Sequence, residues 1–185
     1  MPVETVSLFL ALLFVGAMAI NLAALALVVV RLVTGRVPGP VAPLVDEVRS
    51  IAPFMAFLAP TIAMFGSLYY SEIAHFEPCQ LCWVQRFLMY PSSILLGISM
   101  LLKQPKLAWL PFALSVVGLG VSSYHRAEQQ WPNLFTSSCD PANPCSGRWV
   151  DTWGFVTIPT MAFAAFGLVC VFVPLSLLGR KEATS

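Results

Sequence analysis

Residues 6–30 read VSLFLALLFVGAMAINLAALALVVV, an unbroken run without a charged side chain. About 20 consecutive apolar residues suffice to cross a hydrocarbon core roughly 30 Å thick. A cleaved signal peptide would begin with basic residues and carry an apolar core of about 7–15 residues, whereas the only early charge here is Glu4. The run therefore predicts a membrane-spanning helix that is retained.

Four further stretches have the same character, and they are Ile51–Ala74, Phe87–Leu102, Leu107–Tyr124 and Phe155–Leu178. The second of these is short and reaches full length when Trp83 and Val84 are added. The composition agrees, with 58% hydrophobic and 10% charged residues and a mean hydropathy of +0.80. Because only helices and closed barrels satisfy their backbone in lipid, the sequence predicts an all-α membrane protein without a separate soluble domain.

Basic residues gather in segments that five spans would leave on one side of the membrane. They are Arg31, Arg36 and Arg49 after the first span, Lys103 and Lys106 after the third, and Arg180 and Lys181 in the tail. Short cytoplasmic loops carry an excess of Lys and Arg, so we expect these segments inside and residues 126–153 outside. Residues 41–50 are predicted to form a short interfacial helix. The net charge of +1 gives no indication of a nucleic-acid partner.

Cys79-Gln80-Leu81-Cys82 stands on the expected outer side, just before an apolar run. A two-residue spacer lets the sulfurs close a small, reducible ring, and backbone N–H groups at a helix start lower the pKa of a thiol there. Cys139 and Cys145 form a second pair, kept close by the turn-forming residues 140–144. Thiols on the outer face are expected to be oxidised. Two such pairs suggest a relay of electrons rather than structural cross-links.

Arg86 follows Cys82 by four residues, about one helical turn, so both side chains can face the same neighbour. An arginine near the end of a span commonly anchors to headgroup phosphate. Here it lies just inside an apolar run, where burial costs about 2.5–3.5 kcal/mol, and this favours a role in stabilising a thiolate at Cys82. Gln85 fits either a hydrogen bond to this site or helix packing. Cys170, inside the last run, is predicted to be a small buried hydrophobe.

These residues resemble the DsbB/BdbC family of disulfide-generating membrane oxidases, and in particular its BdbC-like subgroup. Three segments carry the resemblance: Pro78-Cys79-Gln80-Leu81-Cys82-Trp83-Val84-Gln85-Arg86, Ser123-Tyr124-His125 and Trp153-Gly154-Phe155-Val156-Thr157-Ile158-Pro159. The resemblance covers roughly Ile51 to Leu178. The family's core is a four-helix bundle, so Val6–Val30 would be an additional helix. The close spacing of the loop cysteines matches the BdbC-type members.

The resemblance implies an all-α membrane protein with a DsbB-like four-helix transmembrane bundle, residues 51–178, as its oxidoreductase core. Residues 1–50 would form the extra N-terminal transmembrane helix and a cytoplasmic linker, and residues 179–185 a cytoplasmic tail. The chain would be a multi-pass protein of the bacterial cytoplasmic (inner) membrane. Its redox cysteines would lie on the extracytoplasmic face.

The resemblance also implies a quinone-dependent oxidoreductase that generates protein disulfides, with the four paired cysteines as catalytic residues. A thioredoxin-fold, DsbA/BdbD-like thiol oxidase would attack the Cys139–Cys145 disulfide at Cys139, and Cys145 would then attack Cys79. Cys82 would become a thiolate beside a quinone of the membrane pool, either ubiquinone or menaquinone.

The same resemblance implies that Arg86, His125 and Cys82 form the quinone-binding site. The near-neutral pKa of an imidazole suits a hydrogen bond or proton delivery to a quinone oxygen. A plain boundary residue at the wet membrane interface is the open alternative for His125.

Three other interpretations stay open from the sequence. A four-cysteine zinc site needs all four sulfurs to converge as a tetrahedron, and the chain has no second C-x-x-C motif. A structural membrane protein with two stabilising disulfides would leave the shared helix face of the cysteine pair and Arg86 unexplained. An oxidase of the vitamin K epoxide reductase type would place its active pair in a later span, after the loop cysteines, whereas here the order is reversed.

Overall fold

The computed structural model describes residues 2–35, 39–132, 134 and 139–181, and for residues 40 and 178–181 it describes the backbone alone. Some of the basic residues on which the predicted orientation rests lie outside these ranges. Arg36 and residues 182–185 of the expected tail lie outside the described residues, and so do the side chains of Arg180 and Lys181.

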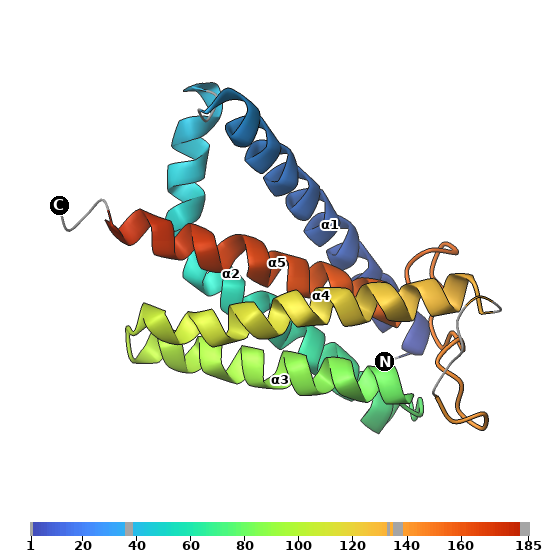
Figure 1. Ribbon diagram of the computed structural model, residues 1–185. Helices are drawn as coiled ribbons and strands as arrows, with labels where there is room; N and C mark the ends of the chain where they lie inside the picture. The colour runs from blue at the N-terminus through green and yellow to red at the C-terminus, as the bar shows by residue number, and fades with distance from the viewer. Residues whose placement is uncertain (1, 36–38, 133, 135–138, 182–185) are drawn as a thin grey trace.

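Within the described ranges, five helices are long and apolar enough to cross a membrane, as the apolar runs predict (Figure 1). They are α1 (Val3–Thr34), α2 (Ala42–Leu68), α3 (Gln80–Leu101), α4 (Trp109–Gln130) and α5 (Ile158–Lys181). A π-helical turn, η2 (Tyr69–Ile73), continues α2, and two short 3-10 helices, η1 (Gly39–Val41) and η3 (Pro105–Ala108), lead into α2 and α4. The chain is an all-α membrane protein, and this prediction is confirmed.

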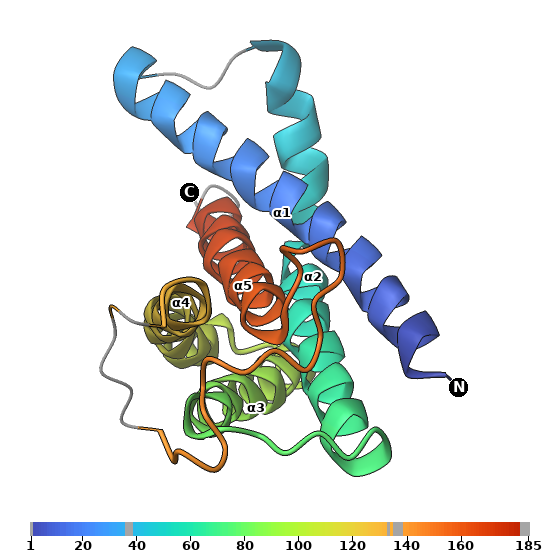
Figure 2. The ribbon, with the colours of Figure 1, turned by 90° about the vertical axis from the view of Figure 1, so that its right-hand side faces the viewer.

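Helices α2 to α5 surround a common apolar core, and α1 lies outside them (Figure 2). In chain order each of these four helices packs on the next, and α5 closes the ring against α2. Buried apolar side chains fill the space between α2, α3 and α5, among them Ala52, Leu96, Val169 and Val173. Small residues such as Ala52 let helix backbones approach closely, which is usual in membrane bundles. The predicted four-helix bundle with one additional helix is therefore present.

Helix α1 contacts the bundle from its start to about Asn21 and diverges from it toward its C-terminal end (Figure 1). The Asn21 amide donates to the carbonyl of Ala164 on α5 at 3.0 Å, beside Gly167, whose lack of a side chain leaves room for it. Near the start of α1, the Tyr70 hydroxyl donates to Ser7 Oγ at 3.0 Å. These polar contacts hold the additional helix against the bundle.

The structure corrects the expectation for residues 41–50. They do not form a separate interfacial helix, because residues 42–50 are the first turns of α2 and continue into the span without a break. Helix α2 contains Pro53 and Pro60, which remove backbone donors and bend a helix, and its first turns lean away from the bundle toward the end of α1 (Figure 1).

A second difference concerns the end of α4, which continues past Tyr124 to Gln130. The apolar run ends at Tyr124, but Ala127 and Glu128 are good helix formers and carry the helix on. His125 therefore lies within α4 rather than at the close of the span. Residues 126–130, expected in the loop, are helical, and Glu128 and Gln129 among them are buried.

The links between helices fall at two opposite ends of the molecule (Figure 1). The link before α3 and the loop between α4 and α5, which carry the two cysteine pairs, lie at the end where α1 begins. The α1–α2 and α3–α4 links lie at the other end, with Arg31, Lys103 and Lys106 in or beside them. The cysteine-bearing segments are thus separated from these basic residues, as the charge pattern predicts.

Helices α4 and α5 come close at Gly118. A Cβ atom there would stand 2.5 Å from ring atoms of Phe166, a fully buried side chain of α5. We expect Gly118→Ala to lower the free energy of unfolding by about 1–3 kcal/mol, as overpacking a core does, measured by thermal unfolding in detergent. Gly120→Ala is the matched control, because nothing lies within 4 Å of its Cβ position. Equal stabilities of the two variants would contradict this packing.

Candidate redox site

Cys79 and Cys82 stand at the first turn of α3. Cys79 is the N-cap residue, with φ −70° and ψ 172°, and its sulfur accepts a hydrogen bond from the backbone N–H of Cys82 at 3.3 Å. Both residues are free thiols, and their sulfurs lie 2.8 Å apart. The first N–H groups of a helix lack partners within it and favour negative charge. The C-x-x-C spacing thus places one sulfur where a thiolate is stabilised.

The hydrogen bond from Cys82 lowers the pKa of the Cys79 thiol from 9.0 to about 4, and it is the largest cause of the shift. A hydrogen bond from His125 and the backbone N–H of Cys82 act in the same direction, whereas burial raises the pKa. A thiol with a low pKa is a good leaving group in disulfide exchange. A thiolate at Cys79 is thus stabilised at the helix start, and the thiolate that the resemblance implies at Cys82 stays a prediction.

His125 connects the two cysteine pairs from its buried position on α4. The Gln85 amide nitrogen lies 2.9 Å from Nδ1. An amide nitrogen only donates, so in this orientation Nδ1 accepts and Nε2 carries the proton of the neutral ring. Nε2 lies 3.0 Å from the carbonyl oxygen of Cys145 and 3.7 Å from the sulfur of Cys79. One N–H group therefore points at both pairs.

The loop between α4 and α5 carries a disulfide between Cys139 and Cys145. Cys145 is fully buried, whereas Cys139 is partly exposed. Asn143, between the two, donates to the carbonyl of Pro78 at 3.3 Å. The turn that holds the disulfide is thus tied to the start of α3, with Cys145 on its inner side and Cys139 nearer to solvent.

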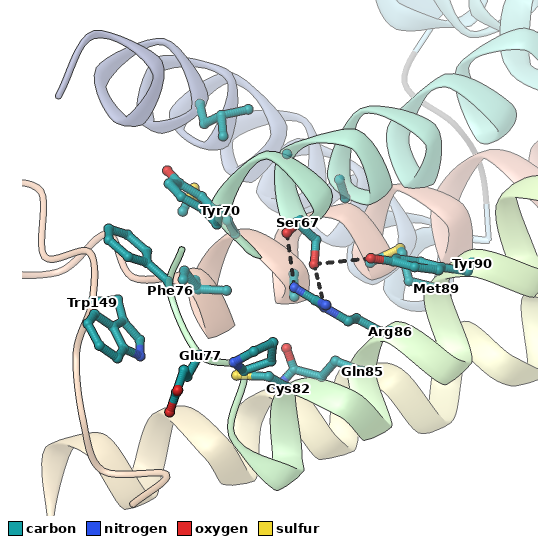
Figure 3. Close-up of a pocket in the computed structure, with 17 residues that line it drawn as sticks. Ser67, Tyr70, Phe76, Glu77, Cys82, Gln85, Arg86, Met89, Tyr90 and Trp149 are labelled. Carbon is teal, nitrogen blue, oxygen red and sulfur yellow. Dashed lines mark hydrogen bonds between the residues drawn. The ribbon is translucent and has the colours of Figure 1, made fainter. Parts of the chain in front are cut away.

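An apolar cleft lies between α2, α3 and α5, and Cys82 and Arg86 form part of its wall (Figure 3). It encloses about 770 Å³ of empty space, including its open mouth. Leu10 of α1 also lines it, so the additional helix contributes to the wall. Four aromatic side chains complete much of the lining, Tyr70, Phe76, Tyr90 and Trp149. A largely apolar cleft with a few polar groups is typical of a site for a small organic ligand.

Arg86 is held at this cleft by Ser67 of α2 (Figure 3). Its Nε donates to Ser67 Oγ at 2.9 Å and its Nη2 to the Ser67 carbonyl at 3.0 Å. The Trp83 ring lies 5.1 Å from the guanidinium carbon, within the range of a cation–π contact. These contacts fix a positive charge in the wall that Cys82 also forms.

The structure brings the predicted residues together in two neighbouring groups. Cys79, Cys145 and His125 meet where α3 begins, and Cys82 and Arg86 face the cleft. His125 lines a smaller pocket with both residues of the C-x-x-C pair, and it is not among the residues that line the cleft. Its predicted contact with a quinone therefore stays a prediction.

The possible metal ligands near the site fall into two groups. One atom each from Cys79, Cys82 and His125 lie within 4.8 Å of one another, a set that could hold a soft metal ion. Cys139 and Cys145 lie near Glu128 instead. Across the residues that the structure describes, the four paired sulfurs thus belong to separate groups, which differs from a tetrahedral four-cysteine zinc site.

Sequence reasoning missed two polar residues of the site, Ser67 and Glu128, and left a third, Gln85, undecided. The role of Gln85 was open, and the structure shows it against His125. Nothing in the sequence distinguishes Ser67, which holds Arg86, from other serines in apolar runs. Glu128 lies beside the loop disulfide. Its spacing of three from His125 places both residues on one helix face, but this signal applies only because the helix continues past Tyr124.

Comparisons with known proteins agree with this geometry. The family model "Disulfide bond formation protein DsbB" matches residues 49–179. Disulfide bond formation protein C of Bacillus subtilis (strain 168) is 38% identical over 135 residues, which cover 72% of this chain and 97% of that protein. The probable disulfide formation protein C of Halalkalibacterium halodurans is 40% identical over 130 residues, 69% of this chain and 92% of that protein. No solved structure gives a significant match.

We expect Cys79 in the reduced chain to be alkylated at a rate that stays constant down to about pH 4 and falls below it, because its thiolate persists to that pH. In Cys82→Ala the largest stabilising hydrogen bond is lost, so the midpoint should rise by several pH units. Timed labelling with iodoacetamide and mass mapping of the Cys79 peptide measure both. Gln80→Ala, which alters an exposed residue of the same turn, should leave the midpoint unchanged. A midpoint near 9 in the unaltered chain would refute the stabilised thiolate.

Proposed function

The chain belongs to the DsbB family of disulfide bond formation proteins, and on this premise we propose that it reoxidises a thioredoxin-like protein and passes the electrons to a membrane quinone. A disulfide oxidoreductase role follows from the family itself. One observation carries the finer proposal: Nε2 of His125 lies 3.0 Å from the carbonyl oxygen of Cys145 and 3.7 Å from the sulfur of Cys79. Exchange between two cysteine pairs requires such an approach.

We place the cysteine-bearing end on the extracytoplasmic side of a bacterial cytoplasmic membrane. Arg31, Lys103 and Lys106 lie at the opposite end of the molecule, and short basic links favour the cytoplasm. Outside the cytoplasm a loop disulfide is stable against the thiols that keep cytosolic cysteines reduced. This orientation also makes the Cys139–Cys145 loop accessible to a soluble partner.

The proposed partner is a thioredoxin-fold, DsbA/BdbD-like thiol oxidase in its reduced form. Its thiolate attacks Cys139, which is the partly exposed sulfur of the loop pair, whereas Cys145 is buried. A bond forms between the partner sulfur and Cys139, the Cys139–Cys145 bond breaks, and the electron pair leaves on Cys145. The partner's second thiol then releases Cys139 and completes the partner's own disulfide.

The inner pair receives the electrons in the next exchange. Cys145 attacks Cys79 of the oxidised inner pair, the Cys79–Cys82 bond breaks, and the electron pair leaves on Cys82 at the cleft. Cys139 then attacks Cys145, which restores the loop disulfide and frees Cys79 as a thiolate. A pKa of about 4 makes Cys79 the good leaving group that this step needs.

The cleft fits a quinone by the chemistry of its walls. Its lining is mainly apolar and aromatic, and Arg86 supplies a fixed positive charge. A bound quinone would supply the oxidising power that removes two electrons from the dithiol. Arg86 would hold the oxygen side of the ring and favour negative charge there, and Cys82 would present the reduced sulfur. Ser67 positions Arg86 for this role.

The order of exchange predicts different products from two single replacements. In Cys145→Ser the Cys139 thiol has no bond partner in the loop, so it can attack the disulfide of an oxidised partner. The bond from Cys139 to the partner forms, the partner's second sulfur leaves as a thiolate, and the linked chain should accumulate because no Cys145 is present to displace the partner from Cys139. Cys139→Ser should form no such species, because the exposed sulfur is gone. Non-reducing electrophoresis and mass mapping after incubation with an oxidised thioredoxin-fold oxidase would show this. Equal trapping by both variants would exclude Cys139 as the point of attack.

Reoxidation of the reduced inner pair should require added quinone, and Arg86→Ala should slow it on the order of 10²-fold, as loss of one fixed electrostatic group does. Reduction of the loop disulfide by the partner in quinone-free detergent should be unchanged. Arg86→Lys, which keeps the positive charge but loses the planar set of guanidinium N–H donors, should recover part of the rate. Arg31→Ala, a charge removed at the other end of the molecule, is the control. Recovery of disulfides without quinone would refute the proposed function.

A further inference from the structure

Glu128 is a buried carboxylate inside the redox site. It is 1% exposed, and neither carboxylate oxygen has a hydrogen-bond partner among the residues that the structure describes. One of these oxygens lies within 4.8 Å of the sulfurs of both Cys139 and Cys145. Burying a carboxylate without partners is costly, and such a group beside an exchangeable disulfide indicates a chemical role.

Helix α4 determines where this carboxylate lies. Glu128 follows His125 by three residues, so both side chains share one face of the helix. That face presents an imidazole to Cys79 and a carboxylate to the loop disulfide. Arg148 of the loop is engaged elsewhere, because its Nη1 pairs with Asp151 at 3.1 Å. Its Nη2 donates to a backbone carbonyl of α4.

Each thiol of the loop pair must lose a proton before it can attack a disulfide. An ordinary cysteine has a pKa of about 8.5, so it is mainly protonated at neutral pH. His125 does not accept this proton in the hydrogen bonding found, because Nδ1 accepts from Gln85 and Nε2 donates. A carboxylate accepts protons, and Glu128 can reach the sulfurs through one water molecule or a change of rotamer.

We propose that Glu128 is the acid–base group for thiol exchange at the loop pair, a role that rests on the proposed function. After reduction of the loop disulfide, Cys139 and Cys145 have taken up protons from solvent and are thiols. The Cys145 S–H bond then breaks and its proton passes to Glu128, while the Cys145–Cys79 bond forms and the Cys79–Cys82 bond breaks. The electron pair leaves on Cys82. In the return step Glu128, having released that proton to solvent, takes the proton of Cys139 as Cys139 attacks Cys145 and frees the Cys79 thiolate.

Several other groups around Glu128 could contribute to a pH dependence. They are His125 and Arg126 on α4, Cys139, Cys145, Arg148 and Asp151 on the loop, and Cys79 and Cys82 at α3. A pH profile of the unaltered chain therefore reports on all of them. The role of Glu128 is isolated by comparing variants at two pH values, since only its own proton transfer is lost in Glu128→Gln.

The test is a single turnover of the full chain in quinone-free detergent. Reduced thioredoxin is mixed with the fully oxidised chain, and acid quenching, alkylation and mass mapping give the rate at which Cys82 becomes a free thiol. We expect Glu128→Gln, which keeps the shape but takes no proton, to slow this rate about 100-fold near pH 6, the lower end of general acid–base effects. Near pH 9.5 the deficit should largely disappear, because thiols then ionise unaided.

Two controls separate this role from a structural one. Glu128→Asp should recover part of the rate near pH 6, and Asp140→Asn, which alters an exposed carboxylate next to Cys139, should keep the rate of the unaltered chain. A Glu128→Gln deficit that is absent, or equal at both pH values, would overturn the acid–base role. If the unaltered chain reduces its loop disulfide but never Cys79–Cys82, the relay of the proposed function fails instead.

Discussion

The site depends on one fixed imidazole. Gln85 donates to Nδ1 of His125, which leaves Nε2 protonated and pointing at the Cys145 carbonyl and the Cys79 sulfur. A buried histidine needs partners on both nitrogens, and here those partners come from α3 and from the loop before α5. Satisfying the ring therefore brings the two cysteine pairs together, and the same N–H contributes to stabilising the Cys79 thiolate.

The position of Cys79 gives the proposed relay its direction. A dithiol whose thiolate is stabilised favours its reduced form, and Cys79 is stabilised by the helix start, by Cys82 and by His125. In the proposed relay this stabilisation would favour electrons on the inner pair. The charge rests on the sulfur that lies near the loop, while Cys82 borders the cleft. In the proposed relay the inner pair would face the loop through Cys79 and the cleft through Cys82.

Hydropathy and motif spacing predicted the spans, the C-x-x-C at a helix start and the two cysteine pairs at one end. They did not predict the polar network, because it depends on which residues of different helices face one another. The end of an apolar run shows where a span leaves the lipid, and the helix itself can continue further. The sequence therefore predicts a span that ends at Tyr124 and a loop that contains Glu128, whereas α4 ends at Gln130. Ser67 gave no signal, since its contact with Arg86 is made between helices.

The additional helix is part of the architecture of the cleft. The family match begins at residue 49, so α1 lies wholly before it. Yet Leu10 lines the cleft, and a Cβ added to Gly66 of α2 would stand 3.1 Å from it, which indicates close packing without a side chain between them. The Tyr70 hydroxyl also donates a hydrogen bond to Ser7 of α1. Helix α1 therefore forms part of the wall of the same cleft that Cys82 and Arg86 line.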